Sequence, residues 1–203
     1  MSSQPHQGEE PTDGLRRAVL IVAILNLLYG SLEFAVALHI GSVSLFADSI
    51  DFFEDASVNI LIFFALQWAP KLRARIGMVL AGVLVVPALA GLWTAIEKIA
   101  VPVAPDALSL GLTGLGALAV NIASAIILAA HRHHRGSLVQ AAFLSARNDA
   151  LANIAIIGAG VVTAFLWHSA WPDLAVGMGI AYLNADAARI VFKAAWDEHV
   201  AVS

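Results

Sequence analysis

Four carboxylates lie within a single apolar stretch of this sequence, where acidic side chains are costly. The stretch runs from about Val43 to Trp68, and its acids are Asp48, Asp51, Glu54 and Asp55. Residues four apart on a helix lie one above the other on the same face, so Asp51 and Asp55 form a stacked pair. Two such carboxylates repel each other unless a proton or a cation lies between them. This spacing predicts one half of a site for a divalent metal ion.

A second group of polar side chains follows the same spacing further along the chain. Ser145, Asp149 and Asn153 recur every four residues, and Asn148 lies beside them. If the two segments are helices that pack face to face, three carboxylates and one or two neutral oxygens converge. Four ligands are enough for a tetrahedral metal ion. The two segments together therefore predict a metal site.

Several acids allow more than one interpretation. The whole cluster can be structural, with Arg147 paired to one of its carboxylates. Asp48 can hydrogen-bond locally, and Glu54 can pair with Arg147, so both are weaker ligand candidates. Glu33 lies seven residues after Asn26 and shares its helical face. It either supports the site or a proton path, or makes an ordinary polar contact with a neighbouring helix.

The composition places these acids in a membrane protein. Of the 203 residues, 60% are hydrophobic and 13% are charged, whereas soluble domains average about 45–50% and about 25%. A soluble domain of this size cannot bury so much apolar surface. The absence of cysteine excludes disulfides, thiolate metal sites and cysteine nucleophiles. The net charge of −4 offers no basic surface for a nucleic acid, and no such partner is expected.

Six segments are apolar and long enough to span a bilayer, which requires about 20 residues. The predicted fold is an all-α membrane protein of six transmembrane helices. We expect a disordered tail over residues 1–14, a membrane domain over 15–193 and a short tail over 194–203. The six predicted helices cover about Leu15–Leu38, Val43–Trp68, Ile76–Ile96, Leu108–Ala130, Leu138–Trp167 and Leu174–Phe192.

Basic residues in the connecting segments predict the orientation, because cytoplasmic loops carry an excess of Lys and Arg. Lys98 stands alone on one side, and Arg147 falls inside a helix and counts for neither side. The alternation predicts that both termini are cytoplasmic. The basic residues on that side are Arg16, Arg17, Lys71, Arg73, Arg75, Arg132, Arg135, Arg189 and Lys193.

Three histidines lie in the predicted cytoplasmic loop before the fifth helix. They are His131, His133 and His134. Imidazoles bind transition metals, so this loop can hand metal to the site. A solvated, weakly basic loop that only fixes the orientation explains them equally well.

The stretch from Gly41 to Asp55, GSVSLFADSIDFFED, resembles the second helix of the cation diffusion facilitator family. The segment from Asn26 to Glu33 is similar to the family's first helix. Asp149 with the following ALAN is similar to its fifth helix, and Trp171-Pro172-Asp173 to the start of its sixth. The resemblance covers the whole membrane portion of the chain.

The resemblance implies export of Zn²⁺, or in some members Cd²⁺, Fe²⁺, Co²⁺ or Mn²⁺, driven by inward proton flow. The family's metal site maps to Asp51, Asp55, Ser145 and Asp149. Ser145 stands where the family usually has histidine, so Asn148 or a water can supply the missing ligand. An all-oxygen site favours harder ions such as Mn²⁺ or Fe²⁺, although Zn²⁺ is the family's commonest cargo.

Only a short segment follows the predicted sixth helix, whereas the family usually has a cytoplasmic domain there that binds metal and holds a dimer together. A homodimer of this chain would therefore rest on membrane contacts. The short loops suggest a bacterial inner (plasma) membrane. An enzyme is disfavoured, because neither His-Glu-x-x-His nor Gly-x-Ser-x-Gly occurs. The remaining alternative is a membrane metal sensor or accessory subunit that does not transport.

Overall fold

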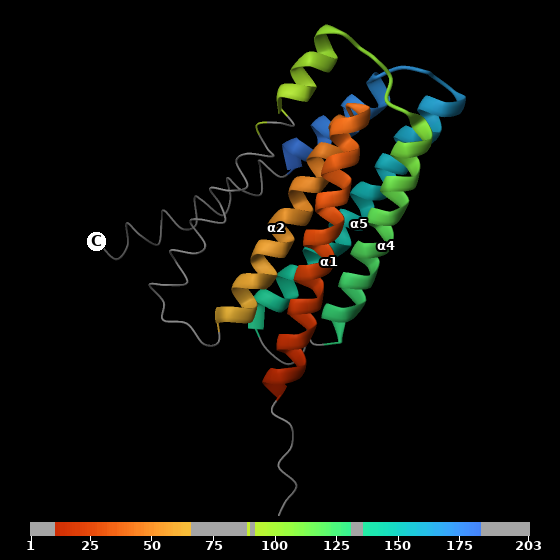
Figure 1. Ribbon diagram of the computed structural model, residues 1–203. Coiled ribbons are helices and arrows are strands. Elements are labelled where there is room, and N and C mark those ends of the chain that lie inside the picture. Colours follow the sequence, from red (N-terminus) through yellow and green to blue (C-terminus); the bar gives the residue numbers. More distant parts are fainter. Residues whose placement is uncertain (1–10, 66–88, 90–91, 131–135, 184–203) are drawn as a thin grey trace, which may run out of the picture.

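A computed structural model describes residues 11–65, 89, 92–130 and 136–183 of the chain. Every regular element within these residues is helical. The long helices are α1 (Pro11–Ile40), α2 (Val43–Ala65), α4 (Ala107–Ala129) and α5 (Gly136–Phe165), and residues 92–100 and 171–183 form two further helices. Figure 1 shows the four long helices side by side, with helix 92–100 at the end of the bundle opposite the start of α1.

The prediction of an all-α fold is confirmed over the described residues. Three helical segments have the length and apolar composition to cross a membrane, namely Gly14–Ile40, Ala107–Ala129 and Ser145–Phe165. α2 has a similar length, with 23 residues that extend over roughly 35 Å. Its four acids make it less apolar than the three candidate spans. The predicted third and sixth helices lie partly outside the described residues. The count of six spans and the cytoplasmic termini therefore stay predictions.

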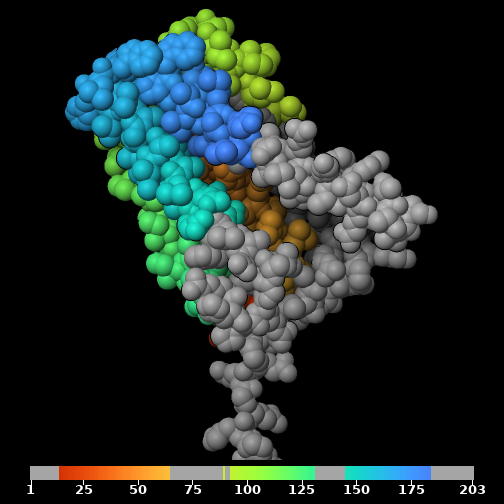
Figure 2. Space-filling view, turned by 180° about the vertical axis from the view of Figure 1, so that it is seen from behind, coloured from red at the N-terminus to blue at the C-terminus, as the bar shows by residue number. Residues whose placement is uncertain are grey.

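The four long helices form two antiparallel hairpins packed side by side. α1 packs against α2, and α4 against α5; the hairpins meet where α1 contacts α4 and α2 contacts α5. Seen from behind, part of α2 is visible beside α5 and helix 171–183 (Figure 2). This arrangement turns α2 and α5 toward each other, as the predicted metal site requires.

The buried face of α1 repeats every three or four residues, as expected for one side of a helix. It includes apolar Val22 and Ala37 together with polar Asn26 and Glu33. The opposite face is apolar but exposed, with Leu28 66% accessible. Polar side chains inside and leucines outside are the reverse of a soluble bundle, because lipid replaces water as the solvent.

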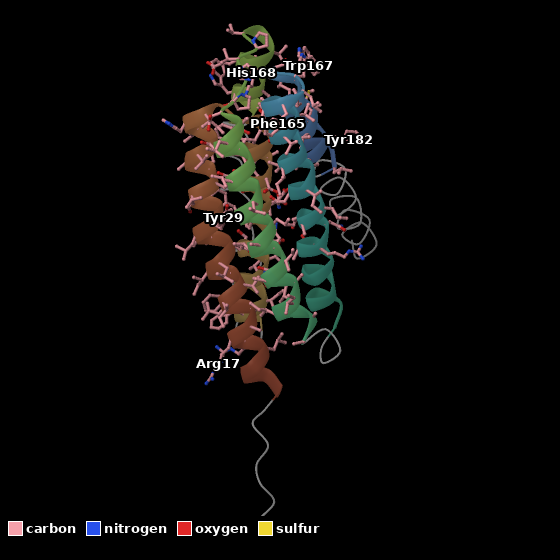
Figure 3. The ribbon with its side chains drawn as sticks, turned by 90° about the vertical axis from the view of Figure 1, so that its right-hand side faces the viewer. Arg17, Tyr29, Phe165, Trp167, His168 and Tyr182 are labelled. Atoms are coloured by element: carbon pink, nitrogen blue, oxygen red, sulfur yellow. The ribbon has the colours of Figure 1, made fainter. Side chains whose placement is uncertain are left out.

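Exposed aromatic residues gather at one end of the bundle. Figure 3 shows Phe165, Trp167 and Tyr182 toward that end and Arg17 at the other, with Tyr29 between them. Trp and Tyr are enriched where a membrane meets water, because their rings are apolar and their tips polar. Their position matches an aromatic belt at one membrane surface.

A tight turn joins α1 to α2 at this aromatic end, which we call the turn end. Gly41 occupies it with φ of +62°, a left-handed conformation that glycine adopts without strain. Gly177 then brings helix 171–183 onto the start of α2. A Cβ atom there would lie 2.7 Å from the backbone nitrogen of Ser44. Only glycine permits this close approach of the two backbones.

Asp173, at the start of helix 171–183, lies at the centre of a buried polar cluster at the turn end. Its carboxylate accepts hydrogen bonds from Ser42 Oγ (2.6 Å), Val43 N (2.9 Å) and Ser44 Oγ (2.6 Å). Lys98 Nζ lies 3.1 Å from the same carboxylate and also donates to a carbonyl oxygen of the α1–α2 turn. Asp173 is fully buried and Lys98 almost so. This Asp173 cluster therefore ties three segments of the chain together.

A layer of apolar side chains separates the Asp173 cluster from the acids of α2. Its buried members include Ala37, Phe46, Leu110 and Ile156, one from each of the four long helices. The ring of Phe34 meets Phe46 edge to face, with centroids 5.4 Å apart. The turn end of the bundle is thus closed first by this apolar layer and then by the Asp173 cluster.

Asp106 ends the loop before α4 and caps that helix. Its Oδ1 accepts a hydrogen bond of 2.8 Å from the backbone nitrogen of Ser109. Hydrogen bonds from Ser109 hold the pKa of this carboxyl below its usual range. Because Asp106 is exposed and caps only its own helix, it serves below as a control acid.

Candidate metal centre

The acidic face of α2 lies in the interior of the bundle, near the middle of the helix. Asp48 is fully buried, and Asp51 and Asp55 are each 8% exposed. Glu54, toward the edge of the acidic face, is exposed. The helix therefore directs three of its four acids inward. Since α2 is an α-helix throughout Val43–Ala65, the predicted stacking of Asp51 on Asp55 is present.

α5 completes the cluster from the opposite side. Ser145 Oγ donates a hydrogen bond of 3.0 Å to Asp55 Oδ1. Asp149, half-buried and one turn further along α5, interacts electrostatically with both Asp51 and Asp55. The structure thus brings together the carboxylates of Asp51, Asp55 and Asp149 with the hydroxyl of Ser145.

The two asparagines of the α5 segment do not join the carboxylates in the same way as Ser145 does. Asn148 is exposed. Asn153 is fully buried, and its Nδ2 donates 2.8 Å to the backbone oxygen of Asp149 and 3.5 Å to Asp48 Oδ1. Asn153 therefore links Asp48 to α5, a role that the four-residue spacing alone did not reveal.

The cluster is acidic but not yet closed around an ion. Within the described residues, no three Asp, Glu, His or Cys side chains lie close enough together to hold one metal ion. To bind one ion together, the stacked acids of α2 and the single acid of α5 would have to approach each other through a shift of the side chains or helices. The chemistry of the set still suits a divalent cation, since its donors are carboxylate and hydroxyl oxygens.

The salt-bridge alternative does not describe this cluster. Arg147 is exposed, as is Glu54, its suggested partner. The ion pair recorded among the described residues joins Lys98 to Asp173 at the turn end. Within the described residues, neither Asp48 nor Asp55 forms an ion pair.

Two further polar groups accompany the acids. Toward the start of α1, Ser124 Oγ of α4 donates a hydrogen bond of 3.4 Å to Asn26 Oδ1. Asn59 Nδ2 donates a hydrogen bond of 2.8 Å to the backbone oxygen of Asp55. Toward the turn end, the buried carboxyl of Glu33 lies beside that of Asp48. The acids of α2 and α5 are thus the centre of a longer polar interior.

The remaining predicted metal-binding residues cannot be placed in this arrangement. His131, His133 and His134 lie outside the described residues. Both interpretations of that loop, metal delivery and a solvated basic loop, stay predictions. His39 and His168 are described and exposed near the turn end, away from the buried acids.

Comparison with known families agrees with this geometry. Residues 19–197 match the family model described as the cation efflux transmembrane domain. No curated protein matches the chain. The matched region contains α2 and α5 with all the acids described above, and it covers most of the 203 residues. The chain therefore belongs to the cation efflux (cation diffusion facilitator) family, whose members are membrane transporters of metal cations rather than enzymes.

Proposed function

We propose that this chain exports Zn²⁺ from the cytoplasm in exchange for protons, with Cd²⁺ as a second substrate. The observation that carries the proposal is the juxtaposition of α2 and α5, in which Ser145 bonds to Asp55. It supports a site of three carboxylates in the interior of the bundle, and charges inside a bilayer are expensive unless an ion or a partner offsets them. A divalent cation among Asp51, Asp55 and Asp149 would relieve their mutual repulsion.

The proposed transport cycle uses one metal site that faces each side in turn. Zn²⁺ enters from the cytoplasm and binds the ionised carboxylates. The closed turn end, with its apolar layer and Asp173 cluster, supports a resting state sealed toward the outside. A rearrangement of the helices then opens that end, and protons compete with the metal so that it leaves.

The surroundings of the site follow from the same proposal. Six spanning helices with cytoplasmic termini would put Arg16 and Arg17 on the cytoplasmic side, which suits the position of Arg17 opposite the aromatic end (Figure 3). The membrane would be a bacterial plasma membrane, and the working unit a homodimer.

The test is Zn²⁺ flux into liposomes that contain the purified chain. An imposed pH gradient should stimulate flux in the native chain, and collapsing the gradient with a proton ionophore should remove the stimulation. Asp106→Asn is the matched control, because it neutralises an exposed acid that lies away from the cluster. Metal binding without flux, tested also with Cd²⁺ and Mn²⁺, would refute transport and favour a metal sensor or accessory subunit.

Ser145→His is expected to shift the metal preference. An imidazole beside Asp55 adds a nitrogen ligand, which Zn²⁺ accepts more readily than Mn²⁺ does. The ratio of Zn²⁺ to Mn²⁺ affinity should rise at least about tenfold, a change of about 1.4 kcal/mol, as measured by titration calorimetry.

Asn148→His supplies the control for this experiment. It adds the same imidazole three residues along α5, where the side chain is exposed. An equal gain in both variants would show that the new histidine binds metal wherever it is placed. A gain confined to Asn148→His would assign the fourth ligand to position 148.

A further inference from the structure

Glu33 on α1 and Asp48 on α2 form a pair of carboxyl groups that the proposed metal site leaves unused. Both side chains are fully buried. The two groups lie within hydrogen-bonding reach of each other. They lie on the turn-end side of Asp51, in contact with neither the lipid-facing surface nor the exposed ends of the bundle.

The oxygens of this pair have few hydrogen-bond donors. Among the described residues, no N–H or O–H donates to either Glu33 oxygen or to Asp48 Oδ2, and all three oxygens are buried. In the same part of the chain, Asp48 Oδ1 receives the long bond of 3.5 Å from Asn153 Nδ2 and no other. Buried carboxylate oxygens are normally satisfied, and each that is not raises the free energy of the folded state by about 1–3 kcal/mol or more.

The charged and titratable groups around the pair do not compensate its charge. On α1, the Tyr29 hydroxyl donates to the backbone oxygen of Thr113 on α4. The groups on α2 and α5 that act electrostatically on the pair are Asp51, Asp55 and Asp149, which are also acidic.

The remaining helices, as far as the structure describes them, supply no compensating charge either. α4 contains no ionisable side chain. In helices 92–100 and 171–183, Lys98 and Asp173 are paired with each other at the turn end. Two ionised carboxylates would therefore face each other in an apolar, negatively charged surrounding.

One proton resolves both problems. When either carboxyl of the pair is protonated, its O–H can donate to the other carboxylate, so one charge disappears and two of the unpaired oxygens gain a partner. We infer that Glu33 and Asp48 share one proton and form a proton-binding site separate from Asp51, Asp55 and Asp149.

The Glu33–Asp48 pair would carry protons in addition to the carboxylates of the metal site. Coupling of this second proton carrier to metal transport rests on the proposed function. Asp48 lies one helical turn from Asp51. A divalent cation at Asp51 would make it easier for the pair to lose its proton to water, because positive charge nearby stabilises the carboxylate. A proton that returns to the pair would in turn weaken metal binding. Metal and proton occupancy would then oppose each other without sharing a ligand.

Infrared spectroscopy of the purified chain in lipid vesicles tests the shared proton without any transport assay. The metal-free native chain should show the carbonyl stretch of a protonated carboxylic acid near neutral pH. Part of its intensity should be lost in Glu33→Gln and in Asp48→Asn, since each new amide donates to the remaining carboxylate, while the acids around Asp51 keep any contribution of their own. Asp106→Asn should lose none of it. Absence of the band in the native chain, or native intensity in both pair variants, would overturn the inference.

Flux measurements test the coupling separately. Glu33→Gln should still bind Zn²⁺, measured by calorimetry, but a pH gradient should stimulate its flux less than that of the native chain. Asp48→Asn serves as the second variant if Glu33→Gln does not fold, as judged by gel filtration. Flux in the pair variants that responds to the gradient as in the native chain would refute the second carrier. If the native chain transports no metal, the infrared result still decides whether the proton is present.

Discussion

Asp51→Asn is expected to lower Zn²⁺ flux at least about 100-fold, because loss of a mere supporting group at a metal site already lowers affinity about 10–100-fold. Asparagine keeps the shape of the side chain but removes the charge that binds the ion. Asp51 is 8% exposed and stacked on Asp55, so no water-exposed group can replace it. Flux into liposomes and calorimetric Zn²⁺ affinity measure the effect.

The same loss is expected for Asp149→Asn, since Asp149 supplies the acid of α5. Glu54→Gln is the matched control, because it neutralises an acid on the same helix whose side chain is exposed. Its flux should stay close to that of the native chain. Near-native flux in both Asp51→Asn and Asp149→Asn would show that the metal crosses elsewhere. An equal loss in Glu54→Gln would point to damage of α2 as a whole.

Asp173→Ala is expected to lower the free energy of unfolding by about 3–5 kcal/mol. The change leaves Lys98 buried without a counter-charge and removes the acceptor of Ser42, Val43 and Ser44. Breaking one side of a buried ion pair is costly because the remaining charge stays out of water. Thermal unfolding in detergent gives the difference from the native chain.

Two comparisons separate this effect from simple loss of an acid. Asp106→Ala removes an exposed helix cap and should lower the free energy of unfolding much less than Asp173→Ala does. Combining Lys98→Met with Asp173→Ala should restore part of the loss, because the uncompensated ammonium is gone. If Asp173→Ala destabilises the chain no more than Asp106→Ala does, the Asp173 cluster does not hold the turn end of the bundle closed.

The long helices could be predicted from the sequence because lipid exposure makes the apolar pattern nearly continuous. The segment predicted for Leu108–Ala130 is observed as Ala107–Ala129. α1 begins at Pro11, before the predicted Leu15. Polar residues at a chain end can continue a helix beyond the membrane, and hydropathy does not detect them.

The pairing of α2 with α5 was also predictable, since four-residue spacing defines a helical face. The spacing placed Ser145 and Asp149 opposite α2, as observed. Asn148 was predicted as a possible ligand, but each residue turns the helix by about 100°, and its side chain is exposed. Its part in metal binding stays a prediction.

The Asp173 cluster could not be predicted. Its partners lie far apart in the sequence, and Lys98 was counted only as a charge that sets orientation. In the sequence, Lys98 is a lone lysine on the less basic side of the predicted membrane, and the Trp-Pro-Asp segment follows much later. Together they are only a weak signal of a contact. Only the folded chain shows that Lys98 and Asp173 are buried together.

The acidic face of α2 has a consequence for how the chain enters a membrane during synthesis. Each acid at the centre of a helix raises the free energy of insertion by about 2.5–3.5 kcal/mol, so α2 is a poor substrate for the insertion machinery on its own. α1, which precedes it, is strongly apolar, and the two pack along their length through contacts such as Phe34 against Phe46. The turn at Gly41 leaves almost no chain between them. We therefore expect α1 and α2 to partition into the bilayer together, as one hairpin.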